Sequence, residues 1–168
     1  MIFPRGALVL LVGPPAAGKS TLAASLVAAG EVAPDDVLST DTYREVLTGD
    51  ALDLTSDRKV WVQVRERLVE KMAAGRTTVV DATNLFPRRR ARHIAVAREH
   101  GRPVVAVRFD VPAPELLERN ERRDRQLRPN VVVTMAVEME EHANPDALAD
   151  EVDVVLDAED VRRQLSES

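Results

Sequence analysis

Eight consecutive residues near the N-terminus have the types and spacing of a phosphate-binding loop. The segment follows the pattern G-x-x-x-x-G-K-[ST] and reads Gly13-Pro14-Pro15-Ala16-Ala17-Gly18-Lys19-Ser20. Glycines let the backbone wrap tightly, so that successive N–H groups point at phosphate oxygens. Lys19 supplies a positive charge for the β- and γ-phosphates, and the Ser20 hydroxyl is a ligand for Mg²⁺. The segment therefore predicts a site for ATP or another nucleoside triphosphate, with Mg²⁺ as cofactor.

The residues on either side of this loop agree with the motif. Residues 7–12 are a short apolar run that suits a buried parallel strand. Residues 21–29 are rich in alanine and leucine and are typical of a helix, whose N-terminus would lie at the phosphates. A glycine turn between a strand and a helix is the alternative, but it requires neither the spacing nor the Lys-Ser pair. We expect the eight loop residues and Thr21 to bind the nucleotide.

A second pair of residues has the chemistry of an acceptor site. Asp41 and Arg44 are three residues apart, just after a second short strand. A carboxylate at that place can take the proton of an acceptor hydroxyl, and an arginine one turn later can hold an anionic group of the substrate. The alternative is a helix that Asp41 caps and whose arginine is solvated.

A third candidate is Asp81, which ends an apolar strand and is followed by Ala82, Thr83 and Asn84. A carboxylate at the end of such a strand can reach the loop-bound Mg²⁺ through water. In the alternative interpretation Asp81 caps a helix. Thr83 and Asn84 either bind substrate or form the turn.

An arginine-rich segment follows later in the chain, with Arg119, Arg122, Arg123, Arg125 and Arg128. The first three would share one helical face by the three-and-four rule. Because phosphoryl transfer spreads negative charge over the γ-phosphoryl oxygens, arginines that close over them stabilise the transition state. The segment predicts a lid over about residues 119–130, with one or two of its arginines at the nucleotide. A solvated helix with glutamate pairs is the alternative.

The remaining candidates have a simpler interpretation. Residues 88–92 hold four arginines that could follow a nucleic-acid backbone or form a charged helix face. Trp61 lies next to the apolar stripe of a helix and is expected in the core. His93, His100 and His142 lack metal-ligand spacing, and we expect them at the surface.

Strand-like and helix-like segments alternate along the chain. The expected strands are residues 7–12, 36–39, 77–81, 103–109 and 152–156. The expected helices are residues 21–29, about 56–74, 87–100, 114–123, 131–141 and 158–165. This order predicts an α/β fold with a five-stranded parallel sheet and helices on both faces. In such sheets the site lies beyond the carboxyl ends of the strands, where Gly13, Asp41, Asp81 and Asp110 fall.

Length and composition narrow the classes of protein. The 168 residues predict a single domain, residues 1–168, and 45% apolar with 30% charged residues is ordinary globular composition. The absence of cysteine excludes disulfides, thiolate metal sites and a cysteine nucleophile. No apolar run reaches the length of a membrane span, and we expect a cytoplasmic protein with no membrane partner. The net charge of −5 does not itself indicate nucleic-acid binding.

Taken in order and spacing, these segments resemble the 5′-hydroxyl polynucleotide kinases. The matching segments are the phosphate-binding loop, the Asp-x-x-Arg of residues 41–44, the Asp-Ala-Thr-Asn of residues 81–84 and the Leu-Glu-Arg-Asn-Glu-Arg-Arg of residues 117–123. The likeness is to the kinase module of bacterial end-healing enzymes and of phage polynucleotide kinase, and it covers about residues 8–156. It implies a P-loop kinase fold and an acceptor that is the 5′-hydroxyl end of RNA or DNA.

The resemblance implies a role for each matching residue on the acceptor side. Asp41 would be the general base on the 5′-hydroxyl, and Arg44 would hold the adjacent phosphate of the acceptor strand. Thr83 and Asn84 would lie in the acceptor pocket.

On the nucleotide side, Lys19 and Ser20 would grip the β- and γ-phosphates and Mg²⁺. Asp81 would organise the metal or the acceptor pocket. Arg123 would contact the transferring phosphate, and Arg119 would lie over the adenine.

Two other functions fit the same residues. One is a P-loop kinase of a small-molecule or nucleotide-sugar acceptor, and the other is a nucleotide-dependent switch without an acceptor. End-healing enzymes usually carry phosphatase or ligase modules, whereas this sequence ends soon after its last expected strand. Arg44 favours the polynucleotide, because a neutral metabolite would not require it.

Overall fold

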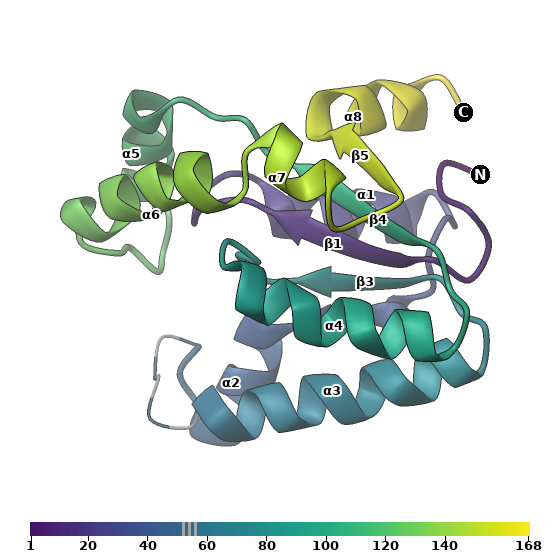
Figure 1. Ribbon diagram of the computed structural model, residues 1–168. Helices are drawn as coiled ribbons and strands as arrows, with labels where there is room; N and C mark the ends of the chain where they lie inside the picture. The colour runs from purple at the N-terminus through teal and green to yellow at the C-terminus, as the bar shows by residue number, and fades with distance from the viewer. Residues whose placement is uncertain (52, 54, 56) are drawn as a thin grey trace.

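Five parallel strands form one sheet in the computed structural model, which describes residues 1–51, 53, 55 and 57–168 (Figure 1). The strands are β1 (Leu8–Val12), β2 (Val37–Ser39), β3 (Thr78–Asp81), β4 (Val104–Arg108) and β5 (Val154–Asp157). Across the sheet they follow the order β2-β3-β1-β4-β5. The strand that carries the phosphate-binding loop is therefore the central one. This confirms the predicted parallel α/β sheet.

Helices cover both faces of the sheet, as expected for parallel strands joined by crossovers. On one face lie α3 (Asp57–Ala73) and α4 (Pro87–Glu99), and on the other lie α1 (Lys19–Ala28) and α8 (Ala158–Ser166) (Figure 1). The apolar residues that recur every four positions along α3 are all fully buried, namely Val60, Val64, Leu68 and Met72. Among the described residues, no helix has the length and apolar character that a membrane span requires.

The side chains of β1 alternate between two separate cores. Leu8, Leu10 and Val12 pack in the core under α3 and α4. Val9 and Leu11 pack in the core under α1 and α8. All five are completely buried, which explains why this strand is an uninterrupted apolar run rather than an alternating one.

The remaining α-helices come after β2, after β4 or before β5 along the chain. They are α2 (Thr40–Thr48), α5 (Ala113–Glu121), α6 (Pro129–His142) and the short α7 (Pro145–Ala149). The sequence analysis placed no helix at α7, although its start has a clear signal: Asn144 accepts a hydrogen bond from the Ala147 N–H at 2.9 Å, and Pro145 is the first helical residue. Ser56, where α3 was expected to begin, lies outside the described residues.

Candidate active site

A cavity of about 670 Å³ opens at the carboxyl ends of β1, β2 and β3. It brings together residues that lie far apart in the sequence. The predicted site residues that line it are Pro15, Ala16, Gly18, Lys19, Ser20, Thr21, Asp41, Arg44, Asp81, Thr83, Asn84, Arg119 and Arg123. Of the predicted loop residues, Gly13, Pro14 and Ala17 do not line this cavity. Apolar residues that the sequence analysis did not single out complete the wall, including Leu127, Val131 and Met135.

The loop between β1 and α1 has a backbone conformation that suits a phosphate. Gly18 has a φ of 95°, a left-handed conformation that glycine adopts without strain, and α1 begins at the next residue. The Gly13 N–H donates to the Thr83 carbonyl at 3.0 Å, which fixes the loop to the end of β3. A methyl group at Gly13 would come within 2.9 Å of the Phe109 Cβ. Only glycine therefore fits at this close approach.

Lys19 is partly buried and lines the cavity. Its Nζ donates to the Pro14 carbonyl at 2.7 Å. Burial lowers the pKa of Lys19 to about 8, although the carboxylates of Asp81 and Asp41 act in the opposite direction and Arg123 adds to the fall. The ammonium group is thus held in a site that disfavours its charge. Bound phosphates would supply the missing negative charge.

Ser20 and Asp81 form an oxygen pair beside this lysine. The Ser20 hydroxyl donates to Asp81 Oδ2 at 2.8 Å. Burial raises the pKa of Asp81, while the Ser20 hydrogen bond and the Lys19 charge oppose that shift. Mg²⁺ binds oxygen and is commonly held by one or two protein ligands together with water and phosphate oxygens. A hydroxyl next to a carboxylate at a phosphate-binding loop fits that donor set.

Arg44 is buried between two carboxylates on the acceptor side of the cavity. Its Nη1 lies 3.0 Å from Asp41 Oδ1, and its Nη2 lies 2.9 Å from Asp57 Oδ1. The Arg44 Nε is buried and has no hydrogen-bond partner among the residues that the structure describes. The interpretation of Asp41 as a helix cap with a solvated arginine is wrong, because Ser39 caps α2 through the Thr42 N–H and Arg44 is inside.

Asn84 joins the ends of two strands. Its φ is 50°, and its Nδ2 donates to the Leu11 carbonyl at 2.8 Å. Weaker contacts reach the Val80 and Ala82 carbonyls. These bonds indicate a turn-forming role for the amide nitrogen. The Asn84 Oδ1 is buried without a hydrogen-bond partner in the described part of the chain, and Asn84 lines the cavity.

The arginine-rich segment is folded differently from the prediction. Helix α5 ends at Glu121, so Arg119, Arg122 and Arg123 do not share a helical face, which corrects the sequence analysis. The cause is Asn120, whose side chain exchanges two hydrogen bonds with the backbone of Leu127 and closes a loop.

Two arginines of this segment reach the cavity, as expected. Arg119 Nη1 donates to the Ala17 carbonyl at 3.3 Å, over the phosphate-binding loop. Arg123 lines the cavity, and its Nη1 is buried with no partner within the described ranges. Arg122 is instead exposed and paired with Glu118, and Arg125 is paired with Glu45 of α2 at 2.8 Å. The segment therefore spans from the nucleotide side to the acceptor side.

Three residues outside the predicted site have positions that correct the sequence analysis. His93 is buried with only 4% of its surface exposed, not at the surface, because α4 packs its ring against Trp61. Trp61 is only partly buried and lines the cavity. Arg90 is completely buried, so the cluster of residues 88–92 is not a uniformly solvated face.

Arg90 fixes the loop that follows β3. It donates to the carbonyls of Asn84 and Leu85 at 2.9 and 2.7 Å and to the carbonyl of His142 at 2.6 Å. Its remaining donors reach both carboxylate oxygens of Glu151. A single buried guanidinium thus holds the acceptor-side loop against the end of α6.

Replacing Arg90 with methionine is expected to lower the free energy of unfolding by about 3–5 kcal/mol, because it leaves three carbonyls and one carboxylate unpaired. Urea unfolding of Arg90→Met and of the exposed control Arg88→Met measures the difference. Equal stabilities of the two variants would contradict this role.

Comparisons with known proteins agree with this geometry. A family model described as an AAA domain matches residues 8–148. A search of curated proteins found no match to the sequence. Among solved structures, the chain is similar to a protein of the Pnkp1/Rnl/Hen1 RNA repair complex, with a TM-score of 0.70 and 20% identity over 83% of this chain and 46% of that one.

Two further structures show the same fold. Another structure of the Pnkp1/Rnl/Hen1 complex matches with a TM-score of 0.59 and 24% identity over 76% of this chain and 43% of that one. A candidate kinase from Chloroflexus aurantiacus matches with a TM-score of 0.63 and 17% identity over 97% of this chain and 96% of that one. The chain thus spans less than half the length of the RNA-repair proteins. Its fold is that of P-loop kinases, which supports the prediction of a phosphotransferase.

Proposed function

Because this chain belongs to the AAA domain family and folds as a P-loop kinase, we propose that it transfers the γ-phosphoryl group of ATP to the 5′-hydroxyl end of a polynucleotide. One observation carries the proposal. The phosphate-binding loop faces the Asp41–Arg44 pair across a single cavity, so that a phosphate donor and an anionic acceptor can meet there. The similarity to proteins of an RNA repair complex supports a nucleic-acid acceptor.

The chain supplies positioning and charge for an in-line displacement. The loop N–H groups and Lys19 hold the β- and γ-phosphates, and Arg123 neutralises charge that develops on the transferring group. Ser20 and Asp81 would hold Mg²⁺, which when bound neutralises the β- and γ-phosphate oxygens. Residues 119–130 would close over the nucleotide as a lid.

Asp41 acts on the acceptor. Its carboxylate takes the proton of the 5′-hydroxyl as the oxygen forms a bond to the γ-phosphorus. The bond between that phosphorus and the β–γ bridging oxygen breaks, and ADP leaves. Arg44 holds Asp41 in place, and its guanidinium group, at the wall of the cavity, offers positive charge to an acceptor phosphate.

Arg44→Gln tests this phosphate contact. It is expected to raise the KM for a nucleoside 3′-phosphate about 10-fold or more, because a charge-assisted hydrogen bond to a phosphate is lost. The KM for a nucleoside without a phosphate should change much less. Steady-state transfer assays with both acceptors measure the effect, and Arg122→Gln, an exposed lid arginine, is the control. An equal rise for both acceptors would remove the phosphate contact from the proposal.

A second candidate is a kinase of a small-molecule acceptor. The similarity to the Chloroflexus kinase favours it, because the match covers 97% of this chain and 96% of that one. A panel of small hydroxyl acceptors, assayed beside a 5′-hydroxyl oligonucleotide, distinguishes the two.

A further inference from the structure

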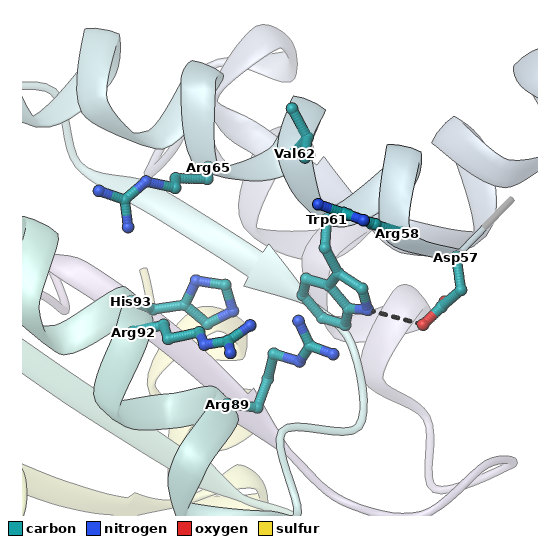
Figure 2. A pocket seen from close by; sticks show the side chains of 8 residues that line it. All are labelled: Asp57, Arg58, Trp61, Val62, Arg65, Arg89, Arg92 and His93. Atoms are coloured by element: carbon teal, nitrogen blue, oxygen red, sulfur yellow. Dashed lines mark hydrogen bonds between the residues drawn. The ribbon is translucent and has the colours of Figure 1, made fainter.

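A second cavity of about 350 Å³ lies between α3 and α4, next to the candidate active site (Figure 2). Asp57, Trp61 and Arg89 line both cavities. The second cavity, which we call the α3–α4 groove, is therefore continuous with the acceptor side of the first. A molecule bound in the groove would therefore lie next to the acceptor group that Asp41 and Arg44 hold.

The α3–α4 groove is strongly basic in a chain whose net charge is −5. Four arginines line it: Arg58, Arg65, Arg89 and Arg92. Figure 2 shows the four side chains around the groove. Within the described residues these four guanidinium groups form no ion pair and no hydrogen bond, whereas most other arginines there are paired. Burial lowers the pKa of Arg89; the Asp57 carboxylate opposes that shift, and the neighbouring Arg92 adds to it. So many unpaired cations in one groove favour an anionic ligand with several charges.

The one carboxylate that lines this groove, Asp57, acts on Arg89 but has both of its oxygens engaged elsewhere. Asp57 Oδ1 is bound by Arg44, and its Oδ2 accepts a hydrogen bond from Trp61 Nε1 at 3.2 Å. The acidic group thus links the active site to the groove and orients the indole ring at the boundary.

Trp61 and Arg89 offer flat surfaces for stacking. The Arg89 guanidinium carbon lies 3.8 Å from the centre of the Trp61 ring. The indole also lies 5.5 Å from the His93 ring at a tilt of 37°. Aromatic rings and arginine planes are the surfaces on which unpaired bases stack, without regard to sequence.

His93 adds an unsatisfied polar atom to the groove. Its Nε2 is buried and has no hydrogen-bond partner in the described part of the chain. Buried polar atoms are nearly always paired with protein, water or ligand. This atom therefore marks a position at which a polar group of a bound molecule, or a water beneath it, belongs.

We propose that the α3–α4 groove binds the single-stranded polynucleotide beyond its reacting 5′ end, with a base against Trp61 and Arg89 and phosphates on Arg58, Arg65 and Arg92. This inference rests on the proposed function, because it requires the 5′-hydroxyl at Asp41. It explains how an acidic protein holds a nucleic acid, because four unpaired arginines are gathered along the path of the strand. Occupancy of the groove also distinguishes a polynucleotide acceptor from a small one, because a small acceptor would leave the groove empty.

The test compares a variant in the groove with a charge-matched control. The groove variant is Arg58→Ala, Arg65→Ala and Arg92→Ala combined, and all three positions are exposed. The control is Arg67→Ala, Arg98→Ala and Arg163→Ala combined, which removes the same charge from exposed positions outside the groove. KM is measured for 5′-hydroxyl acceptors from a nucleoside 3′-phosphate to an octanucleotide.

For the unchanged protein, KM should fall as the acceptor lengthens from one to four nucleotides. The groove variant should lose this gain, so that its KM for the tetranucleotide is at least about tenfold higher. The slope of log affinity for the tetranucleotide against log salt concentration should become shallower by about 2, because three phosphate contacts are lost. KM for the nucleoside 3′-phosphate and for ATP should stay the same. A KM that does not depend on acceptor length, or an equal loss in the control, would overturn the inference while leaving the kinase function in place.

A binding measurement does not depend on turnover. Trp61 is the one tryptophan of the sequence, so its fluorescence reports on the groove. A 5′-hydroxyl tetranucleotide without ATP should quench it, and the groove variant should need at least about tenfold more oligonucleotide. Equal quenching by a nucleoside monophosphate would overturn the inference and assign the groove to a small ligand. If no acceptor is labelled at all, the proposed function fails, and this titration still decides whether the groove binds a strand.

Discussion

Asp41→Asn is expected to lower the rate of phosphoryl transfer at least about 100-fold while ATP still binds. The amide keeps the shape of the carboxylate and can still face Arg44, but it cannot take the proton of the acceptor hydroxyl. Single-turnover transfer gives the rate of the chemical step, and calorimetric titration of the same variant gives the affinity for ATP. The expected result is a large fall in the first quantity with little change in the second.

Asp57→Asn is the matched control for this variant. Asp57 is also a carboxylate bound to Arg44, at 2.9 Å, and it lines the same cavity. If Asp41 acts only by positioning Arg44, both variants should lose activity to a similar extent. If Asp41 is the base, the Asp57 variant should keep most of the single-turnover rate. Near-normal transfer by Asp41→Asn would show that the assigned base is wrong.

Lys19→Met should reduce transfer about 100- to 1,000-fold with every acceptor, whether polynucleotide or small molecule. Lys19 lies on the donor side, and removal of one charge-stabilising group at a reacting centre has an effect of this size. Transfer assays with an oligonucleotide, together with ATP hydrolysis in the absence of acceptor, measure it. A variant that keeps normal transfer would contradict the site itself, not only the choice of acceptor.

The same substitution should stabilise the protein without nucleotide near pH 7. Burial lowers the pKa of Lys19 from its ordinary value of 10.5 to about 8. Below pH 8 the folded state therefore carries a buried charge that it disfavours. Between pH 8 and 10.5 the unfolded chain binds the additional proton, so the free energy of unfolding rises with pH. Lys19→Met removes this dependence and should be more stable by about 2–3 kcal/mol at pH 7.

Urea unfolding at pH 7 and pH 10 measures that stability difference. It should be large at pH 7 and small at pH 10. Lys59→Met, which removes an exposed lysine of α3, is the control and should show no such change. A difference that is the same at both pH values would contradict the buried charge. Greater stability with lost transfer would also show that the activity loss is not caused by misfolding.

The sequence predicted the central part of the site because few chain geometries satisfy its constraints. Gly18 and Lys19 follow an apolar run, and only a strand–loop–helix turn places them where they can bind a phosphate. Asp41 and Asp81 come directly after strands, and parallel strands bring their carboxyl ends to one edge. The alternation of strands and helices predicted five parallel strands but not their order across the sheet, which depends on long-range packing.

Residues whose environment depends on packing between distant helices were not predicted correctly. His93 is buried because α3 brings Trp61 against it, and nothing local to α4 indicates that contact. Arg90 is buried because Glu151, 61 residues away, reaches it. Helix α5 ends where the Asn120 side chain bonds to the backbone of Leu127. This side-chain bond competes with continuation of the helix, and the spacing of residues in the sequence does not reveal it.

Transfer from γ-labelled ATP to a 5′-hydroxyl oligonucleotide tests the central claim most directly. The assay contains Mg²⁺, the same oligonucleotide with a 5′-phosphate, a panel of small hydroxyl acceptors and the Asp41→Asn variant. Label is expected on the 5′-hydroxyl strand alone, and the Asp41→Asn variant should lose it. Label on a small acceptor and not on the oligonucleotide, or on neither while ATP is bound, would contradict it.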